Sequence, residues 1–97
     1  MAIEVQTHTS NMLEEPKMYL VYMLNDDYTT WDFCLRIITD VFHKTLEEAD
    51  NITREIDTKG KGLCGSYTYE VAETKAFRVQ VEARREGFPM KCSVEEA

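Results

Sequence analysis

The chain has 97 residues, a length that supports one domain with a single core and a shallow pocket, but not a deep cleft between lobes. Its formal net charge is −7 and its 11 Lys and Arg residues form no long run, which argues against binding a phosphate backbone. No apolar stretch approaches the roughly 20 residues that cross a bilayer, and the N-terminus lacks the basic and then apolar order of an export signal. We therefore expect a cytoplasmic protein with no membrane or nucleic-acid partner.

Residues 1–16 show neither helical nor strand periodicity and end in a proline, which disfavours helix just before it. We expect them to form a flexible tail, followed by a core domain over residues 17–97. A run of apolar residues over 18–24 opens that domain. It predicts a strand that is covered on both faces, or at least centrally placed in its sheet.

A polar cluster follows this strand directly, at residues 25–30, and includes Asn25, Asp26 and Asp27. Its usual meaning is a turn and a helix start, because Asn and Asp side chains bond their own backbone in turns. The alternatives are an acceptor-rich cup for the ammonium group of a ligand, or a metal site. Metal is the weakest of the three, since a calcium loop needs alternating acids, a glycine and a distal Glu over twelve residues. We expect no metal and no cofactor.

Two helices come next. Thr29 followed by Asp32 is a capping signature for a first helix over residues 30–42. Thr45 with Glu48 forms a capping box for a second helix that ends near residue 60. The expected buried stripes consist of apolar residues at helical spacing; they are Trp31, Cys34, Leu35, Ile38 and Phe42 on the first helix and Ala49, Ile52 and Ile56 on the second.

The rest of the chain predicts a strand over residues 61–67 that another backbone approaches closely at its glycines, a third helix, and a last strand with one wet face over 90–94. Thr68 can cap the third helix, and Gly87 and Pro89 stop it. The element order is β-α-α-β-α-β. This order implies a two-layer α+β sandwich, although periodicity alone leaves the strand directions open.

The reactive residue types give little support for catalysis. The three cysteines Cys34, Cys64 and Cys92 form no C-x-x-C pair, so we interpret them as reduced packing residues rather than a disulfide framework or a zinc site. His8 and His43 are not placed by sequence beside a nucleophile with a supporting acid. These observations favour a binding module over an enzyme.

Three segments, at residues 25–30, 60–65 and 69–75, together resemble ClpS, the bacterial adaptor of the Clp protease. The resemblance covers nearly everything from residue 17 onward. It implies a three-stranded antiparallel sheet with three helices packed on one side. It also implies a function: binding proteins that begin with a destabilising residue (Phe, Tyr, Trp or Leu) and delivering them to a ClpA-type unfoldase.

The resemblance also implies a binding site. An N-terminal residue of this kind presents one ammonium group and one apolar side chain, so its receptor needs acceptors at the mouth of an apolar pocket. Asn25 and Asp26 are the implied acceptors, together with Asp57 where the family commonly has a His. The implied pocket lining departs from the family pattern at Trp31 and Thr53, where Met or another aliphatic residue is usual; the full lining is Thr29, Trp31, Cys34, Thr53, Ile56 and Met90.

Glu70 and Lys75 match family positions that contact the N-terminal domain of the unfoldase. Their alternative interpretation is a solvated helix face, since surface charges contribute little to folding. By the same resemblance, the tail would serve in hand-over to the unfoldase. The alternative function is a regulator that docks on the unfoldase but recognises N-terminal residues weakly, its pocket having been remodelled by Trp31, Thr53 and Asp57.

Overall fold

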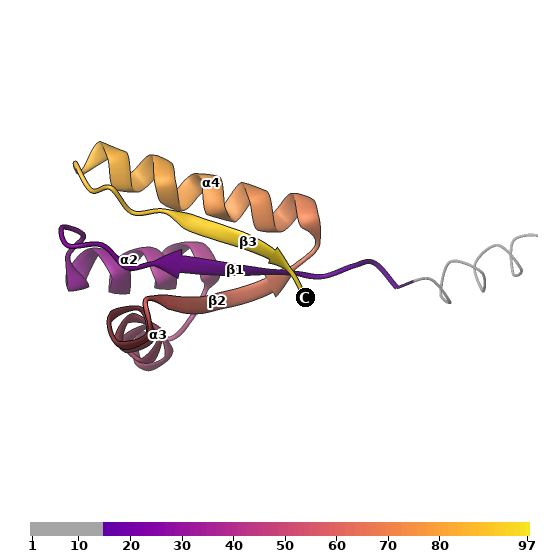
Figure 1. Cartoon of the computed structure of the whole chain (residues 1–97), viewed down its shortest axis with the longest axis horizontal. Coiled ribbons are helices and arrows are strands. Elements are labelled where there is room, and N and C mark those ends of the chain that lie inside the picture. The colour runs from indigo at the N-terminus through magenta and orange to yellow at the C-terminus, as the bar shows by residue number, and fades with distance from the viewer. Residues whose placement is uncertain (1–14) are drawn as a thin grey trace, which may run out of the picture.

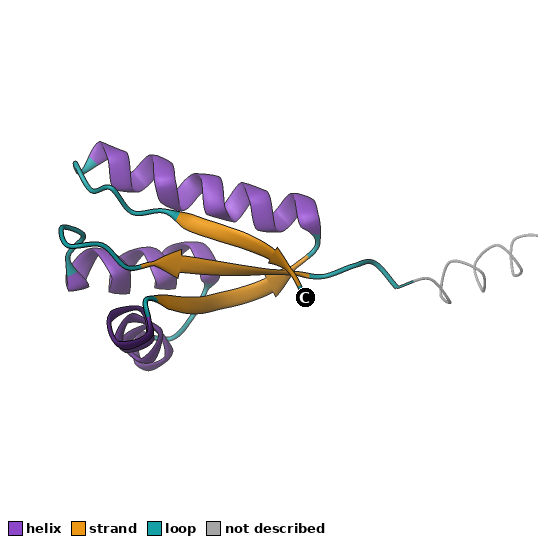
Figure 2. Ribbon diagram, in the orientation of Figure 1, coloured by secondary structure: helices purple, strands orange, loops and turns teal. Residues whose placement is uncertain are grey.

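The computed structural model describes residues 15–97, so the predicted tail lies outside the described residues except for Glu15 and Pro16. The chain alternates strands and helices in the predicted β-α-α-β-α-β order (Figure 2). The elements are β1 (Tyr19–Leu24), α2 (Trp31–Phe42), α3 (Leu46–Lys59), β2 (Lys61–Tyr67), α4 (Tyr69–Arg85) and β3 (Cys92–Glu96).

The three strands form one sheet in the order β2-β1-β3, with both pairings antiparallel. The central position of β1 is therefore confirmed. Its cover on both faces is not, because Val21 and Met23 are fully buried whereas Leu20 and Tyr22 stay partly exposed. Successive side chains of a strand point to opposite faces, so the helices cover one face of the sheet and leave the other to solvent.

Helix α2 lies behind β1 in Figure 1, between α4 and α3, and it contacts both of these helices. This position buries more of α2 than the predicted stripe. Cys34, Ile38 and Phe42 are buried as expected, but so are three further residues, Phe33, Ile37 and Val41. Trp31 was expected in the core, yet 39 % of its surface is exposed, and Leu35 is half-buried. A helix packed against a sheet and two neighbours buries a wider arc than one packed on a single surface.

The predicted cap of α2 was one residue early. Thr30 is the N-cap, and its side-chain oxygen accepts a hydrogen bond from the Phe33 N–H at 3.2 Å. Thr29 instead donates its hydroxyl to Asp26. The capping box of α3 is confirmed, because Thr45 and Glu48 bond each other's backbone N–H groups.

Helix α3 packs tightly against β2 at Gly62. A Cβ placed on this glycine would lie 2.7 Å from the carbonyl oxygen of Ile52 and 2.7 Å from the Ile56 side chain. The close backbone approach predicted for this strand is therefore confirmed at Gly62, whereas Gly65 is approached by the ring of Tyr67. This contact fixes the distance between α3 and the sheet.

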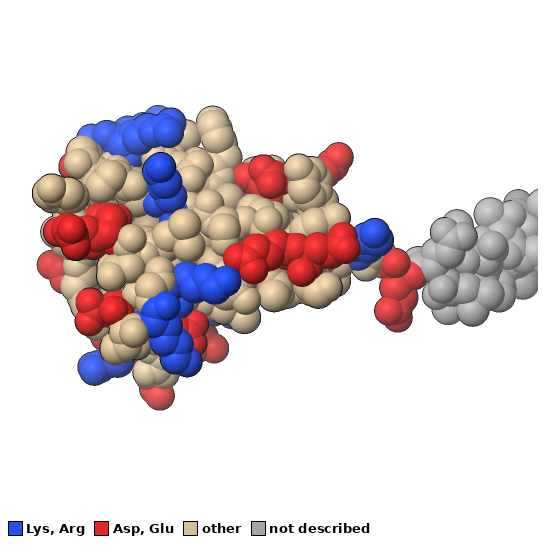
Figure 3. Space-filling view, in the orientation of Figure 1, with Lys and Arg blue, Asp and Glu red and all other residues tan. Residues whose placement is uncertain are grey.

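Within residues 15–97, no helix is long and apolar enough to cross a membrane. On the face drawn in Figure 3, basic side chains gather over the C-terminal end of α4, where Arg84 and Arg85 lie. Acidic side chains follow the end of β3, where Glu95 pairs with Lys61 and Glu96 with Lys17. Positive and negative groups therefore lie next to each other over much of this face, and neither dominates it.

Candidate functional site

A small cavity of about 100 Å³ opens where β1 ends, between the start of α2 and the second half of α3. All of its lining residues belong to the site predicted from the sequence: Asn25, Asp26, Thr29, Trp31, Cys34, Thr53, Ile56 and Asp57. The predicted residue that does not line it is Met90, which precedes β3 and is 4 % exposed in the core. Residues from three separate elements thus converge at one place.

The carboxylate of Asp26 organises the turn at the mouth of the cavity. Its Oδ1 accepts hydrogen bonds from the backbone N–H groups of Tyr28 at 2.8 Å and Thr29 at 2.7 Å. Its Oδ2 accepts the hydroxyl of Thr29 at 2.6 Å. The turn predicted for this cluster is therefore present. The same hydrogen bonds orient the carboxylate of Asp26, which the alternative interpretation of this cluster makes an acceptor for a ligand.

These bonds also keep Asp26 ionised. Burial by itself raises the pKa of this carboxyl, but the hydrogen bonds from Thr29 and Tyr28 outweigh burial and hold the pKa below its ordinary value. A carboxylate offers about four acceptor positions, and three are used within the turn. One position on Oδ2 therefore remains for a donor that comes from solvent.

Two further acceptors stand at the same mouth. The side chains of Asn25 and Asp57 are exposed, and neither makes a hydrogen bond to any other described residue. Asn25 is held by its backbone N–H, which donates to the carbonyl of Gly60 at 2.9 Å. Asp57 comes from the last turn and a half of α3. An amide oxygen and two carboxylates facing one opening suit a ligand that carries a compact positive charge.

The inner wall of the cavity is formed by Cys34, Thr53 and Ile56, although polar atoms predominate over its lining as a whole. Cys34 and Ile56 are buried core residues, and the hydroxyl of buried Thr53 is already bonded to the Ala49 carbonyl at 2.7 Å. Burial, with a contribution from the charge of Asp26, raises the pKa of the Cys34 thiol to about 11. Cys34 therefore stays protonated near neutral pH, which is the opposite of what a nucleophilic cysteine requires.

Trp31 lies at the edge of the cavity and is held there by residues that the sequence did not identify. Its indole Nε1–H donates to Asp50 Oδ1 at 3.2 Å, and the guanidinium of Arg54 lies 6.0 Å from the centre of its ring. Asp50 and Arg54 are four residues apart on α3, a spacing that suggests an ion pair. Their contacts with Trp31, which lies 19 residues before Asp50, could not be predicted from spacing along one helix.

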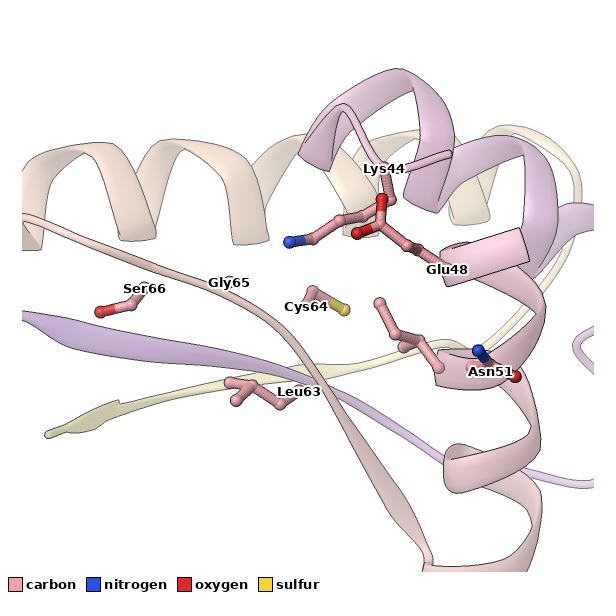
Figure 4. A pocket seen from close by; sticks show the side chains of 8 residues that line it. Lys44, Glu48, Asn51, Leu63, Cys64, Gly65 and Ser66 are labelled. Atoms are coloured by element: carbon pink, nitrogen blue, oxygen red, sulfur yellow. The ribbon is translucent and has the colours of Figure 1, made fainter. Parts of the chain in front are cut away.

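A larger cavity of about 320 Å³ lies between the first half of α3 and β2. Figure 4 shows the side chains of Lys44 and Glu48 reaching over the strand beside Cys64. Glu48 is already committed to the capping box, where its Oε1 accepts the Thr45 N–H. This cavity therefore has a single carboxylate, partly used in the cap, where the smaller one has two. Among residues 15–97, no three His, Cys, Asp or Glu side chains come together as metal ligands would.

The two residues predicted to dock a partner lie on one groove of about 360 Å³ along α4, lined by Glu70, Val71, Thr74, Lys75 and Arg78. Lys75 also has a role within the fold. Its ammonium donates to the Val41 carbonyl at 2.7 Å, in the last turn of α2, and lies 5.1 Å from the ring centre of Tyr67. Glu70 makes no ion pair with a described residue, so its carboxylate is free for other contacts.

Fold and cavity together define a small α+β domain with an acceptor-lined pocket whose inner wall includes buried apolar side chains, a construction that suits a binding module. Over residues 14–93 the sequence matches the family described as ATP-dependent Clp protease adaptor protein ClpS. A relative of that name from Helicobacter hepaticus is 48 % identical over 91 residues, which cover 94 % of this chain and 92 % of the relative. One from Nitratidesulfovibrio vulgaris is 53 % identical over 81 residues, which cover 84 % and 78 %.

Among solved structures, Agrobacterium tumefaciens ClpS2 bound to L-phenylalaninamide is similar with a TM-score of 0.82 and 28 % identity, covering 86 % of this chain and all of that one. The chain belongs to the ClpS family of adaptors of the ATP-dependent Clp protease. The expected three-stranded antiparallel sheet with three helices is thereby confirmed both by the structure and by the family.

Proposed function

We propose that this protein binds substrates whose first residue is Phe, Tyr, Trp or Leu and delivers them to a ClpA-type unfoldase. The observation that carries the proposal is the cavity at the end of β1, where the acceptors Asn25, Asp26 and Asp57 stand at the mouth and buried apolar side chains line part of the inner wall. The ammonium group of the substrate would meet the acceptors, and its first side chain would enter the interior. No chemical step is required of the protein.

The volume of the cavity and the ligand of a similar solved structure support this proposal. A cavity of roughly 150 Å³ accommodates benzene, and the one here measures about 100 Å³ without a ligand. One aromatic or leucine side chain is therefore the scale of group that it could take with modest side-chain movement. The similar ClpS2 was solved with L-phenylalaninamide, a molecule that has a free amino group and an aromatic side chain.

Titration with a short peptide beginning in Phe, and with the same peptide acetylated at its N-terminus, tests this function. We expect the free peptide to bind and the acetylated one to bind at least tenfold more weakly, because acetylation removes the positive charge and two donors. Equal binding of both peptides would refute recognition of the amino group. Failure of both to bind would favour the alternative, a docking regulator whose pocket is remodelled by Trp31, Thr53 and Asp57.

Binding should be nearly independent of pH from about 8 down to about 5.5. The low pKa of Asp26 keeps its carboxylate charged throughout that range, whereas a free α-amino group loses its proton above about 8. Affinity should therefore fall on the alkaline side, and on the acid side only as the carboxylates take up protons.

Asp57→His should add a new decline near pH 6.5, where an imidazole becomes a cation that repels the ligand. Peptide anisotropy across pH for both proteins measures this effect. A decline near pH 6.5 in the unchanged protein would mean that Asp57 does not take the place of the histidine and that another group controls the site.

We also propose that Glu70, with Lys75, docks on the N-terminal domain of the unfoldase, and that residues 1–16 take part in hand-over. Glu70→Lys should weaken co-elution with that domain several-fold and leave peptide affinity unchanged, because a reversed rim charge acts on the partner and not on the cavity. Glu73→Lys, which changes an exposed acid outside the groove on the same helix, is the matched control.

Two outcomes would contradict docking through Glu70: the same loss in both variants, or no loss in either. Reversing Lys75 is a poorer test, because its ammonium also holds the Val41 carbonyl.

A further inference from the structure

Trp31 is fixed by contacts with α3 rather than by burial. Its indole N–H donates to Asp50 Oδ1 at 3.2 Å, while Asp50 Oδ2 accepts from Arg54 Nε at 2.9 Å. The guanidinium of Arg54 in turn lies 6.0 Å from the ring centre, at the limit for a cation–π contact. The three side chains thus form a closed set that joins the first turn of α2 to the middle of α3.

This set stands at the mouth of the cavity. Trp31 is 39 % exposed, whereas Cys34 and Ile56, which line the same cavity, are buried and form its interior. A ligand whose ammonium group is held by the acceptors at the mouth would have its Cβ close to that mouth as well. The ring of Trp31 is therefore placed to meet substituents on the ligand's Cβ before those further along the side chain.

An indole has only two rotatable side-chain bonds, so two contacts are enough to fix its orientation. Without them a half-exposed tryptophan could turn about these bonds and widen the mouth. A solvent-exposed pair such as Asp50 and Arg54 contributes little to the stability of the fold. The contribution of this pair is instead to orient the ring of Trp31.

We propose that Asp50 and Arg54 are positioning residues that hold Trp31 as a fixed wall of the cavity and so exclude N-terminal residues branched at Cβ, such as Ile and Val. The inference rests on the proposed function, since it assigns the selectivity of the same site. It adds two residues that do not line the cavity and act only through Trp31.

Affinities for a Phe-initiated and an Ile-initiated peptide, measured for the full chain and its variants, test this proposal. Asp50→Ala and Arg54→Ala should each raise Ile binding relative to Phe binding about three- to tenfold, the effect of losing one orienting contact. Trp31→Ala should raise it at least as much. Lys59→Ala, which removes the Glu55–Lys59 pair on the same helix, should leave the ratio unchanged.

A double variant separates positioning from a general effect on α3. Once Trp31 is alanine, Asp50→Ala should change the ratio no further, because residues that act through one side chain are not additive. An equal change in both backgrounds would overturn the proposal, and so would an unchanged ratio in Asp50→Ala.

Fluorescence gives a second readout that needs no peptide, because Trp31 is the single tryptophan of the chain. Its anisotropy decay should gain a fast component in Asp50→Ala and Arg54→Ala, and not in Lys59→Ala. If the parent protein binds neither peptide, the proposed function fails. Independently of that result, an unchanged anisotropy decay of Trp31 in Asp50→Ala would overturn the positioning role.

Discussion

Replacing Asp26 by alanine is expected to weaken binding of a Phe-initiated peptide by about ten- to a hundredfold. A hydrogen bond to a charged group contributes about 1.5–3 kcal/mol, and every 1.4 kcal/mol is about a factor of ten in affinity. The change would also remove the acceptor for Tyr28, for the backbone of Thr29 and for its hydroxyl. Loss of the charge and loosening of the turn act in the same direction.

Peptide titration of Asp26→Ala should be compared with titration of two other variants. Asp27→Ala removes an adjacent exposed carboxylate that makes no hydrogen bond to a described residue, so it should bind nearly as the parent does. Asp26→Asn keeps an acceptor for the turn but loses the charge, and it should fall between the two. Parental affinity in Asp26→Ala would rule out this carboxylate as a ligand of the amino group.

Gly62→Ala should destabilise the fold by about 1–3 kcal/mol, the usual range for overpacking a filled core. The new Cβ would lie 2.7 Å from the Ile52 carbonyl oxygen, a backbone atom that moves only if α3 moves. Because α3 carries Thr53, Ile56 and Asp57, its displacement should also weaken peptide binding. A local packing change on β2 would thus lower peptide affinity at the binding site.

Urea unfolding measures this effect, and Ser66→Ala, an exposed change on the same strand, provides the control. If the unfolding midpoint of Gly62→Ala equals that of the control, α3 can shift at this contact without a loss of stability. An unchanged peptide affinity together with a lowered midpoint would mean that the site does not depend on the spacing between α3 and the sheet.

Much of the fold was predictable because its signals are local. The predicted strand over residues 61–67 matches β2, since a glycine stop at Gly60 and the alternation after it mark both boundaries. The capping box of Thr45 and Glu48 marks the start of α3 in the same way. Strand direction could not be derived from periodicity and came only from the resemblance to the family.

The errors arise where tertiary contacts override local patterns. Thr29 satisfies the rule for a helix cap as well as Thr30 does, but Asp26 takes its hydroxyl and its N–H, so the helix starts one residue later. Trp31 fits the apolar stripe of α2, yet its indole N–H needs a partner and finds Asp50 on the next helix. No spacing rule along a single element contains that information.

The candidate site likewise combines features that the sequence predicts with contacts that only the fold reveals. The sequence alone left a turn and an acceptor cup as alternatives for residues 25–30, and the geometry shows the turn, with one acceptor position of the Asp26 carboxylate left unused within it. The resemblance supplied the residues of α3, and the fold brings Thr53, Ile56 and Asp57 to the end of β1. Trp31 at the opening also contacts Asp50 and Arg54, which the resemblance did not include.

Amide and indole chemical shifts recorded during titration with a Phe-initiated peptide test most directly where the ligand binds. We expect the largest changes at the backbone N–H of Thr29 and at the indole N–H of Trp31, because both groups lie at the mouth of the cavity. Changes concentrated at Lys44 and Ser66, around the larger cavity beside β2, with none at Thr29 or Trp31, would contradict the account.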